Sequence, residues 1–304
     1  MKIKYFSFLG MLLAGIVISF SSCLRLDSNL YNLSDKITEY KLDNYTGTQD
    51  FILDASYTIP DSLITKFTLS SQASGETSPT TIHAIYIGSI SKIATDTVIM
   101  YCHGNKWHMD FYWQRAKLMA NTGSKNRFGV LMIDYRGFGL SEGTPSEDGL
   151  YADVDAALKW LNGNGLSNSR LVMYGFSMGS APATKLTAEP RSMTPSKLIL
   201  EAPFASADVM AADGTQLNMP GSYFTNLKLN NAEEIKLVQW PLCWIHGMND
   251  NFLNYQTHGQ VVYDNYNGSY KEKHLVEGAD HGEIPAKMGF AEYNSVLLNF
   301  ITQH

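Results

Sequence analysis

Along most of the chain, short continuous apolar runs alternate with longer stretches in which apolar residues recur at helical spacing. The apolar runs lie at residues 97–104, 128–137, 170–175, 196–204 and 241–247, and a further strand is expected at 271–278. Runs of this length that are apolar throughout are typical of strands buried on both faces. The pattern therefore predicts a sheet whose strands are mostly internal.

Helices are expected between these runs, at 112–123, 146–165 and 289–301. The second begins at Ser146, a residue type suited to capping a helix N-terminus, and stops at glycines. Its face is formed by Leu150, Val154, Leu158 and Leu161. Apolar strands that alternate with amphipathic helices predict an α/β fold, with a mainly parallel sheet and helices on both of its faces.

The N-terminal part of this region has a different pattern. Residues 51–57, 64–71 and 80–89 are β-like, and the polar, turn-rich stretch 71–80 joins the last two into an expected antiparallel hairpin. Residues 205–239 are less regular than their surroundings. We interpret them as a small, lid-like insertion rather than a second domain.

Composition narrows the class of protein only slightly. The chain has 304 residues, of which 44% are hydrophobic and 17% charged, with a net charge of -6. These values are ordinary for a globular chain. No long basic run or basic–aromatic alternation is present, so a nucleic-acid partner is not expected.

The first residues look like an export signal. Lys2 and Lys4 precede an apolar run over residues 5–20, and small residues then lead to Cys23. The run is shorter than the ~20 residues of a spanning helix. The cysteine after the small residues resembles a bacterial lipoprotein signal, in which that cysteine is lipidated; an uncleaved N-terminal anchor is the alternative.

This interpretation sets the expected organisation of the chain. Residues 1–22 are expected to be a signal peptide, 23–50 a polar tether, and 51–304 the main α/β domain with its lid-like insertion at 205–239. The mature protein would be exported and held on a membrane of a bacterial cell envelope through lipidated Cys23.

Two segments match the pattern G-x-S-x-G, around Ser177 and around Ser141. Ser177 follows an apolar run at once and precedes a small-residue segment, which is the strand–turn–helix context of a nucleophile elbow. Gly175 and Gly179 would let the backbone pass close to the serine. Ser141 lies seven residues after its strand, before Thr144 and Pro145, and is expected to be a loop serine.

A serine hydroxyl needs a base and an orienting acid to act as a nucleophile. Three histidines follow or end apolar strands: His103, His246 and His281. Pro182, about five residues beyond the nucleophile, indicates a helix that kinks or begins loosely.

The chain resembles the α/β-hydrolase superfamily, and within it the small serine hydrolases of the Bem46-like and serine-aminopeptidase-like type. The resemblance rests on "YCHGN", "DYRGFGLSEGTPSEDGLYADVDAALKWL", "GFSMG", "EAPF", "IHGMND" and "ADHG", in this order over residues 80–302. It implies an α/β-hydrolase fold with Ser177 as nucleophile, Asp250 as acid and His281 as base. Glu201 and Asp208 are rival acids, whereas Asp280 adjoins His281 and is not expected to orient its ring.

An oxyanion in such a site requires N–H donors. The residue after the nucleophile, Met178, is expected to supply one backbone amide, and the resemblance implies that Asn105 supplies the other, with His103 shaping that loop. It also implies that the strands of Cys102 and Cys243 are separated by two others, too far for a disulfide, so both are expected to be buried free thiols. No cofactor or metal is expected, because no cluster has ligand spacing.

The expected reaction is hydrolysis of an ester or related acyl bond through an acyl-enzyme. Apolar pocket residues could come from Trp107, Phe111, Tyr112 and Trp113, or from Tyr223 and Phe224 in the insertion. Glu233 and Glu234 leave open an aminopeptidase-like activity, since such an enzyme must hold an ammonium. A third hypothesis is a non-catalytic surface lipoprotein that uses the scaffold for binding.

Overall fold

The computed structural model describes residues 31, 36–215 and 225–304, and the side chains of these residues except 214 and 215. The predicted signal peptide and Cys23 lie outside the described residues, as do Tyr223 and Phe224. Within the described part of the chain, no helix is both long enough and apolar enough to span a membrane.

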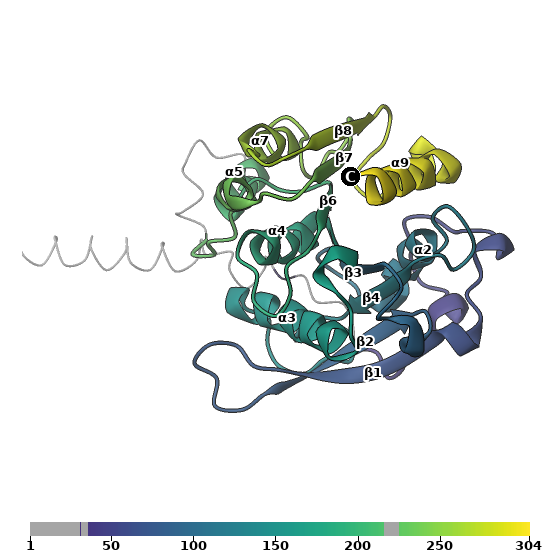
Figure 1. Cartoon of the computed structure of the whole chain (residues 1–304). Coiled ribbons are helices and arrows are strands. Elements are labelled where there is room, and N and C mark those ends of the chain that lie inside the picture. The colour runs from purple at the N-terminus through teal and green to yellow at the C-terminus, as the bar shows by residue number, and fades with distance from the viewer. Residues whose placement is uncertain (1–30, 32–35, 216–224) are drawn as a thin grey trace, which may run out of the picture.

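An eight-stranded sheet forms the centre of the molecule (Figure 1). Its strands, in spatial order, are β1 (Ile64–Ser71), β2 (Thr80–Ile87), β4 (Gly129–Ile133), β3 (Val98–Cys102), β5 (Leu171–Phe176), β6 (Lys197–Glu201), β7 (Leu242–Gly247) and β8 (Lys271–Val276). β1 and β2 form the predicted hairpin, and β2 runs antiparallel to β4. All other neighbours are parallel.

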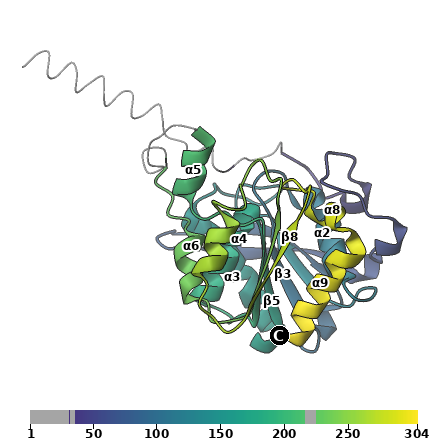
Figure 2. The same cartoon turned by 90° about the horizontal axis from the view of Figure 1, so that it is seen from above.

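Helices cover both faces of this sheet (Figure 2). On one face lie α2 (Met109–Ala120), α8 (Ile284–Met288) and α9 (Phe290–Gln303), and on the other lie α3 (Glu147–Gly163), α4 (Ser180–Ala188), α6 (Asn231–Glu234) and α7 (Gly259–Asn265). Each face has its own hydrophobic core, so β5 sends Met173 into one core and Val172 and Tyr174 into the other. Burial on both faces explains why the strands are continuously apolar. The predicted α/β-hydrolase fold is thus confirmed.

Several local predictions need correction. Residues 51–57 are not a strand: Asp54 accepts a hydrogen bond from Ser56 N, and a 3₁₀ turn forms at Ala55–Tyr57. A side chain that bonds to its own backbone in this way competes with strand pairing. The helix expected from residue 112 begins earlier, at Met109. The sequence pattern did not reveal α7 or α8.

Two further segments matter for the site. Residues 36–50 run along the α2 side, where Tyr40 and Leu42 are buried and Asp110 accepts hydrogen bonds from the Lys41 and Leu42 amides. The described part of the 205–239 insertion holds α5 (Ala207–Thr215) and α6.

The cysteine prediction is confirmed: Cys102 and Cys243 are buried free thiols, with β5 and β6 between their strands.

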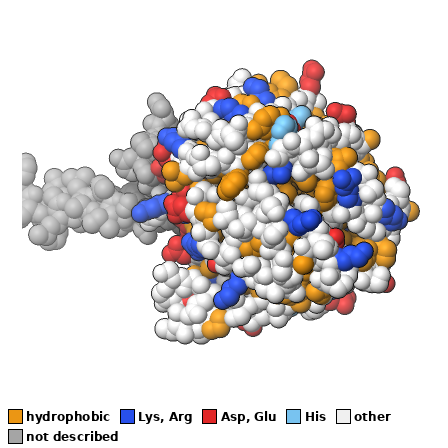
Figure 3. Space-filling model, viewed as in Figure 1, with side chains coloured by type: hydrophobic (Ala, Val, Ile, Leu, Met, Phe, Trp, Pro, Cys, Tyr) orange, Lys and Arg blue, Asp and Glu red, His pale blue; other side chains and the backbone are white. Residues whose placement is uncertain are grey.

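The face seen in Figure 3 carries hydrophobic, acidic and basic side chains intermixed. Lysines and arginines on the described part of this face are scattered rather than gathered into one patch.

Candidate active site

Ser177 lies at the tight turn between β5 and α4. Its backbone adopts φ of +53°, in the left-handed region that non-glycine residues rarely occupy. A Cβ on Gly179 would overlap the Cys102 carbonyl, and one on Gly175 would lie 2.6 Å from the Ser180 Cα. The two flanking glycines are therefore required by close backbone packing, as the elbow interpretation expects.

The helix behind this turn starts in two stages. A 3₁₀ turn spans Ser177–Gly179, and α4 begins only at Ser180. Pro182 is thus the third residue of α4 rather than an interior residue. Its missing N–H falls among the first amides of the helix, which have no intrahelical partner in any case. The helix thus begins with a 3₁₀ turn, and Pro182 lies in the first turn of α4, where proline is tolerated.

The loops after β7 and β8 bring Asp250 and His281 to this serine. His281 Nε2 lies 2.9 Å from Ser177 Oγ, and His281 Nδ1 lies 2.7 Å from Asp250 Oδ2. Ser177 and Asp250 are buried, whereas the His281 side chain is 20% exposed. The three residues form the hydrogen-bonded order serine–imidazole–carboxylate.

Asp250 is held on both of its oxygens. Its Oδ1 accepts hydrogen bonds from the amides of Phe252, at 2.9 Å, and Leu253, at 2.7 Å. Its Oδ2 also lies 3.2 Å from His246 Nε2. Burial by itself raises the pKa of Asp250, but hydrogen bonds from His246 and His281 outweigh burial and hold that pKa well below its usual range. The carboxyl is therefore ionised and able to orient the imidazole.

The rival acids are engaged elsewhere. Glu201 is fully buried and accepts hydrogen bonds from Arg115, and Asp208 is exposed in the first turn of α5. Asp280 Oδ1 accepts from the amides of Asn251 and His281, so it shapes the loop. These positions agree with the interpretation of Asp250 as the partner of His281.

The other histidines and the second G-x-S-x-G serine have structural partners. His103 Nδ1 contacts the Gly104 carbonyl, at 2.8 Å, within the loop that follows β3. Ser141 Oγ donates to the Asp134 carbonyl and accepts from the His83 amide, which makes it a loop serine with backbone hydrogen bonds. His246 supports Asp250 from four residues upstream, a role that the motif "HGMND" did not disclose.

Two cavities border Ser177. One, of about 360 Å³, is lined by residues from several segments: Asp50, Asn105, Lys106, Trp107, Phe111, Tyr112, Phe176, Ser177, Phe252, His281 and Gly282. The other, of about 30 Å³, is lined by Tyr31, Asn105, Ser177, Met178, Phe204, Met210, Leu227, Leu229, Phe252 and Leu253. Asn105 and Met178, the predicted oxyanion donors, thus lie beside the serine. Trp113 is buried in the core instead.

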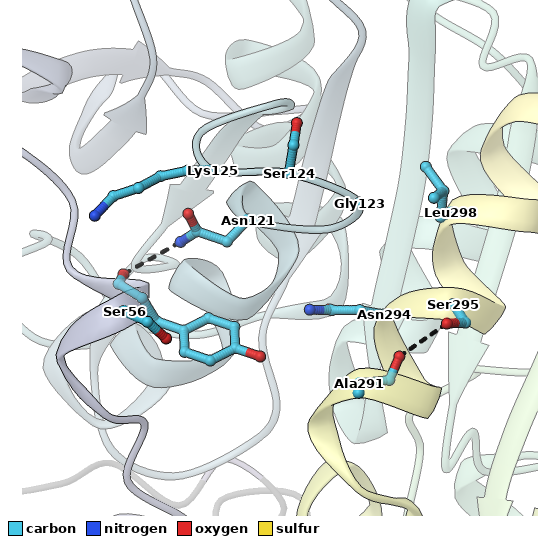
Figure 4. A pocket seen from close by; sticks show the side chains of 10 residues that line it. Ser56, Asn121, Gly123, Ser124, Lys125, Ala291, Asn294, Ser295 and Leu298 are labelled. Carbon is cyan, nitrogen blue, oxygen red and sulfur yellow. Dashed lines mark hydrogen bonds between the residues drawn. The ribbon is translucent and has the colours of Figure 1, made fainter.

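A hollow of about 460 Å³ lies away from the serine, between the 3₁₀ turn at Ala55–Tyr57 and α9 (Figure 4). Its described lining includes Ser56, Asn121, Lys125 and Asn294 but none of the three hydrogen-bonded residues. Figure 4 shows mostly polar side chains around it, with Asn121 and Lys125 on one side and Asn294 and Ser295 on α9. Size alone therefore does not mark the site, because the reactive groups converge elsewhere.

One group of side chains has ligand types suited to a metal ion. Cys243, Glu272 and His274 have donor atoms within 4.8 Å of one another on β7 and β8. Glu272 already accepts hydrogen bonds from His274 and Tyr270, and burial raises the pKa of the Cys243 thiol well above its usual value. A neutral thiol beside a satisfied carboxylate is also what an ordinary buried polar cluster contains.

Comparison with known proteins shows which proteins this chain is similar to. A family model described as "Serine aminopeptidase, S33" matches residues 94–238. The chain is 29% identical over 206 residues to alpha/beta hydrolase domain-containing protein 17B of Xenopus tropicalis, covering 67% of this chain and 66% of that protein. It is also 29% identical over 205 residues to protein 17C of Homo sapiens, covering 67% and 57%. The chain thus spans less than two thirds of these relatives.

Solved structures extend the likeness in fold. The esterase Pf2001 of Pyrococcus furiosus superposes with a TM-score of 0.61 at 18% identity, over 85% of this chain and 98% of that one. An alpha-beta hydrolase of Vibrio vulnificus gives 0.59 at 19%, over 88% and 96%. The chain is thus similar to α/β hydrolases of the S33 and esterase types, and the solved structures share its fold.

Proposed function

We propose that this protein is a serine hydrolase that cleaves carboxylic esters. The observation that carries the proposal is the hydrogen-bonded series Ser177–His281–Asp250 at a strained turn. In this proposal Ser177 is the nucleophile, His281 the general base and Asp250 the acid that orients and stabilises the imidazolium.

The reaction follows from the positions of the three side chains. Ser177 Oγ attacks the ester carbonyl while its proton passes to His281 Nε2. The amides of Met178 and Asn105 are the proposed donors to the oxyanion. Collapse of the intermediate breaks the acyl C–O bond, and the alcohol leaves with the proton from His281. Water, deprotonated by His281, then attacks the acyl-enzyme and releases the carboxylic acid and Ser177.

An aminopeptidase-like activity is the second candidate, because the matching family model has that description. Such an enzyme must bind a substrate ammonium. Asp50, the carboxylate in the larger cavity, is paired with Arg115 at 2.9 Å, and Lys106 lines the same cavity. Glu233 and Glu234 pair with Lys236 and Lys185 and line neither cavity. These charges favour an ester over a peptide with a free ammonium.

A fluorophosphonate probe tests the proposed nucleophile. We expect it to label the wild-type protein and Ser141→Ala, the matched serine in the second G-x-S-x-G segment, but not Ser177→Ala. Folding of all three is checked by circular dichroism. A folded wild-type protein that stays unlabelled would contradict the proposal and favour a scaffold used for binding.

We further propose, from the N-terminal sequence alone, that the protein is exported and anchored to a membrane through lipidated Cys23. Cys23→Ser should then move the protein from the membrane fraction to the soluble fraction. Retention of this variant in the membrane would instead indicate an uncleaved apolar anchor.

A further inference from the structure

The two cavities beside Ser177 differ in size and in chemistry. Both include Asn105, Ser177 and Phe252 in their walls. His281 lines only the larger cavity, of about 360 Å³, and Met178 lines only the smaller one, of about 30 Å³. A substrate carbonyl at the serine would therefore have one substituent on the His281 side and the other on the Met178 side.

The proposed mechanism determines which substituent goes where. The leaving alcohol takes its proton from His281 Nε2, so its oxygen must lie within hydrogen-bond reach of that nitrogen. Since His281 Nε2 is 2.9 Å from Ser177 Oγ, the leaving oxygen lies on the side of the larger cavity. The acyl substituent then points away from His281, into the smaller cavity.

The smaller cavity is apolar and short. Met178, Phe204 and Leu253 form buried walls, and none of its described lining residues is charged. A volume of about 30 Å³ holds roughly two water-sized groups. It can thus receive a short uncharged acyl chain of about two to four carbons, while a charged acyl group would be left without a partner.

The larger cavity is walled by aromatic rings. Trp107 and Phe111 stack with centroids 5.7 Å apart, and Phe252 stands edge-on to the His281 ring at 5.2 Å. Trp107 sits at a φ of +63°, and Lys106 Nζ lies 4.7 Å from the centroid of its ring. Flat rings at these separations suit a flat, aromatic leaving group better than a long flexible one.

We propose that the substrates are short-chain acyl esters of larger, aromatic-bearing alcohols, with the acyl chain in the Met178 cavity and the alcohol in the Trp107 cavity. This assignment rests on the proposed serine-hydrolase function and adds the class of substrate to it.

Two matched series of esters test the assignment in the full-length protein. In 2-naphthylmethyl acetate, butyrate and octanoate only the acyl chain changes, and we expect kcat/KM for octanoate to be about 100-fold below that for acetate. Between ethyl acetate and 2-naphthylmethyl acetate only the alcohol changes. Both release an alkanol, and kcat/KM should be at least about tenfold higher for the naphthylmethyl ester.

Variants separate the two cavities. Met210→Ala, which widens the acyl cavity from α5, should raise the octanoate-to-acetate ratio of kcat/KM by about tenfold. Trp107→Ala should lower the naphthylmethyl-to-ethyl ratio by about tenfold. Trp240→Ala removes an exposed indole remote from the serine and should change neither ratio.

The outcomes distinguish this inference from the function on which it rests. Absence of fluorophosphonate labelling would remove the proposed function. Labelling of Ser177 together with equal or faster hydrolysis of octanoate would keep the function and overturn the acyl assignment. A Trp107→Ala variant with an unchanged naphthylmethyl-to-ethyl ratio would overturn the assignment of the alcohol.

Discussion

Two buried arginines, one on each face of the sheet, each pair with two carboxylates. Arg115 on α2 pairs with Glu201 and Asp50, and Arg136 after β4 pairs with Asp153 and Glu76. Both side chains are only 2% exposed. Burial by itself lowers the pKa of each guanidinium. The neighbouring carboxylates raise that pKa by a larger amount, so each arginine stays charged.

The surroundings of Arg115 connect it to the candidate site. Its Nη2 donates to the Gly282 carbonyl, at 3.2 Å, next to His281. Its guanidinium also lies 4.1 Å from the ring centroid of Phe176, the residue before Ser177. Arg115 therefore ties the histidine loop and the end of β5 to α2.

The surroundings of Arg136 connect only parts of the scaffold. It donates to Asp153 on α3 and to Ser71 Oγ at the end of β1, and it pairs with Glu76 in the hairpin loop. A Cβ on Gly149 would overlap its side chain, so α3 is packed directly on it. The difference shows that one kind of buried ion cluster can hold the loops of the candidate site in place or can serve only the packing of helices against strands.

Removing each arginine gives the largest expected contrast. Both Arg115→Met and Arg136→Met should lose about 3–5 kcal/mol of unfolding free energy, because buried carboxylates are left without their cation. Only Arg115→Met should also lower kcat/KM, by about 100-fold, since small displacements of a catalytic group have effects of this order. Ester hydrolysis per folded molecule and urea unfolding measure the two effects.

An equal loss of kcat/KM in Arg115→Met and Arg136→Met would contradict the proposed difference between the two arginine clusters. Should the methionine variants not fold, Arg115→Lys and Arg136→Lys carry the same comparison, because they keep the charge but lose the planar fork of donors.

A smaller effect is expected from single hydroxyl groups in the two clusters. The Tyr293 hydroxyl donates to a Glu201 carboxylate oxygen, and the Ser71 hydroxyl donates to an Asp153 carboxylate oxygen. Each oxygen–oxygen distance is 2.6 Å. Tyr293→Phe and Ser71→Ala should each cost about 1–3 kcal/mol of unfolding free energy, because a buried carboxylate loses a donor. Thermal unfolding checks this cost. Only Tyr293→Phe should lower kcat/KM, and an equal loss of activity in Ser71→Ala would argue against the contrast.

The smallest effect is a dependence on pH within the Arg115 cluster. Burial raises the pKa of Glu201, but Arg115 and the hydroxyls of Tyr174 and Tyr293 outweigh it, and the pKa lies below its ordinary value of 4.5. Such a carboxylate stabilises the fold above its unfolded pKa, and the contribution is lost as pH falls through the folded pKa.

The Tm difference between wild type and Glu201→Gln should therefore be full near neutral pH and should narrow once pH falls below about 4.5. Thermal melts from neutral to acidic pH measure it. A difference that widens on acidification would mean that the Glu201 carboxylate is not stabilised in its ionised form.

Local pattern was enough to predict most of the sheet and the strand–turn–helix segment around Ser177. The strand at Leu171–Phe176 and the turn at Ser177 depend on neighbouring residues and on two glycines, so both were recognisable from the sequence. The erroneous strand at 51–57 has β-like composition, but Asp54 closes a turn there. Resemblance, rather than spacing, singled out Asp250 and His281.

The sequence by itself determined where most strands and the longest helices lie along the chain, because burial on one or two faces leaves a short-range apolar period. Only the tertiary structure decided that Arg115 meets Glu201 and Gly282, because Glu201 lies 86 and Gly282 lies 167 positions from Arg115 along the chain. It also decided the unequal cavities on either side of Ser177, since their walls come from segments far apart in sequence. Periodicity records whether a side chain is buried, but it does not record which distant side chain it will touch.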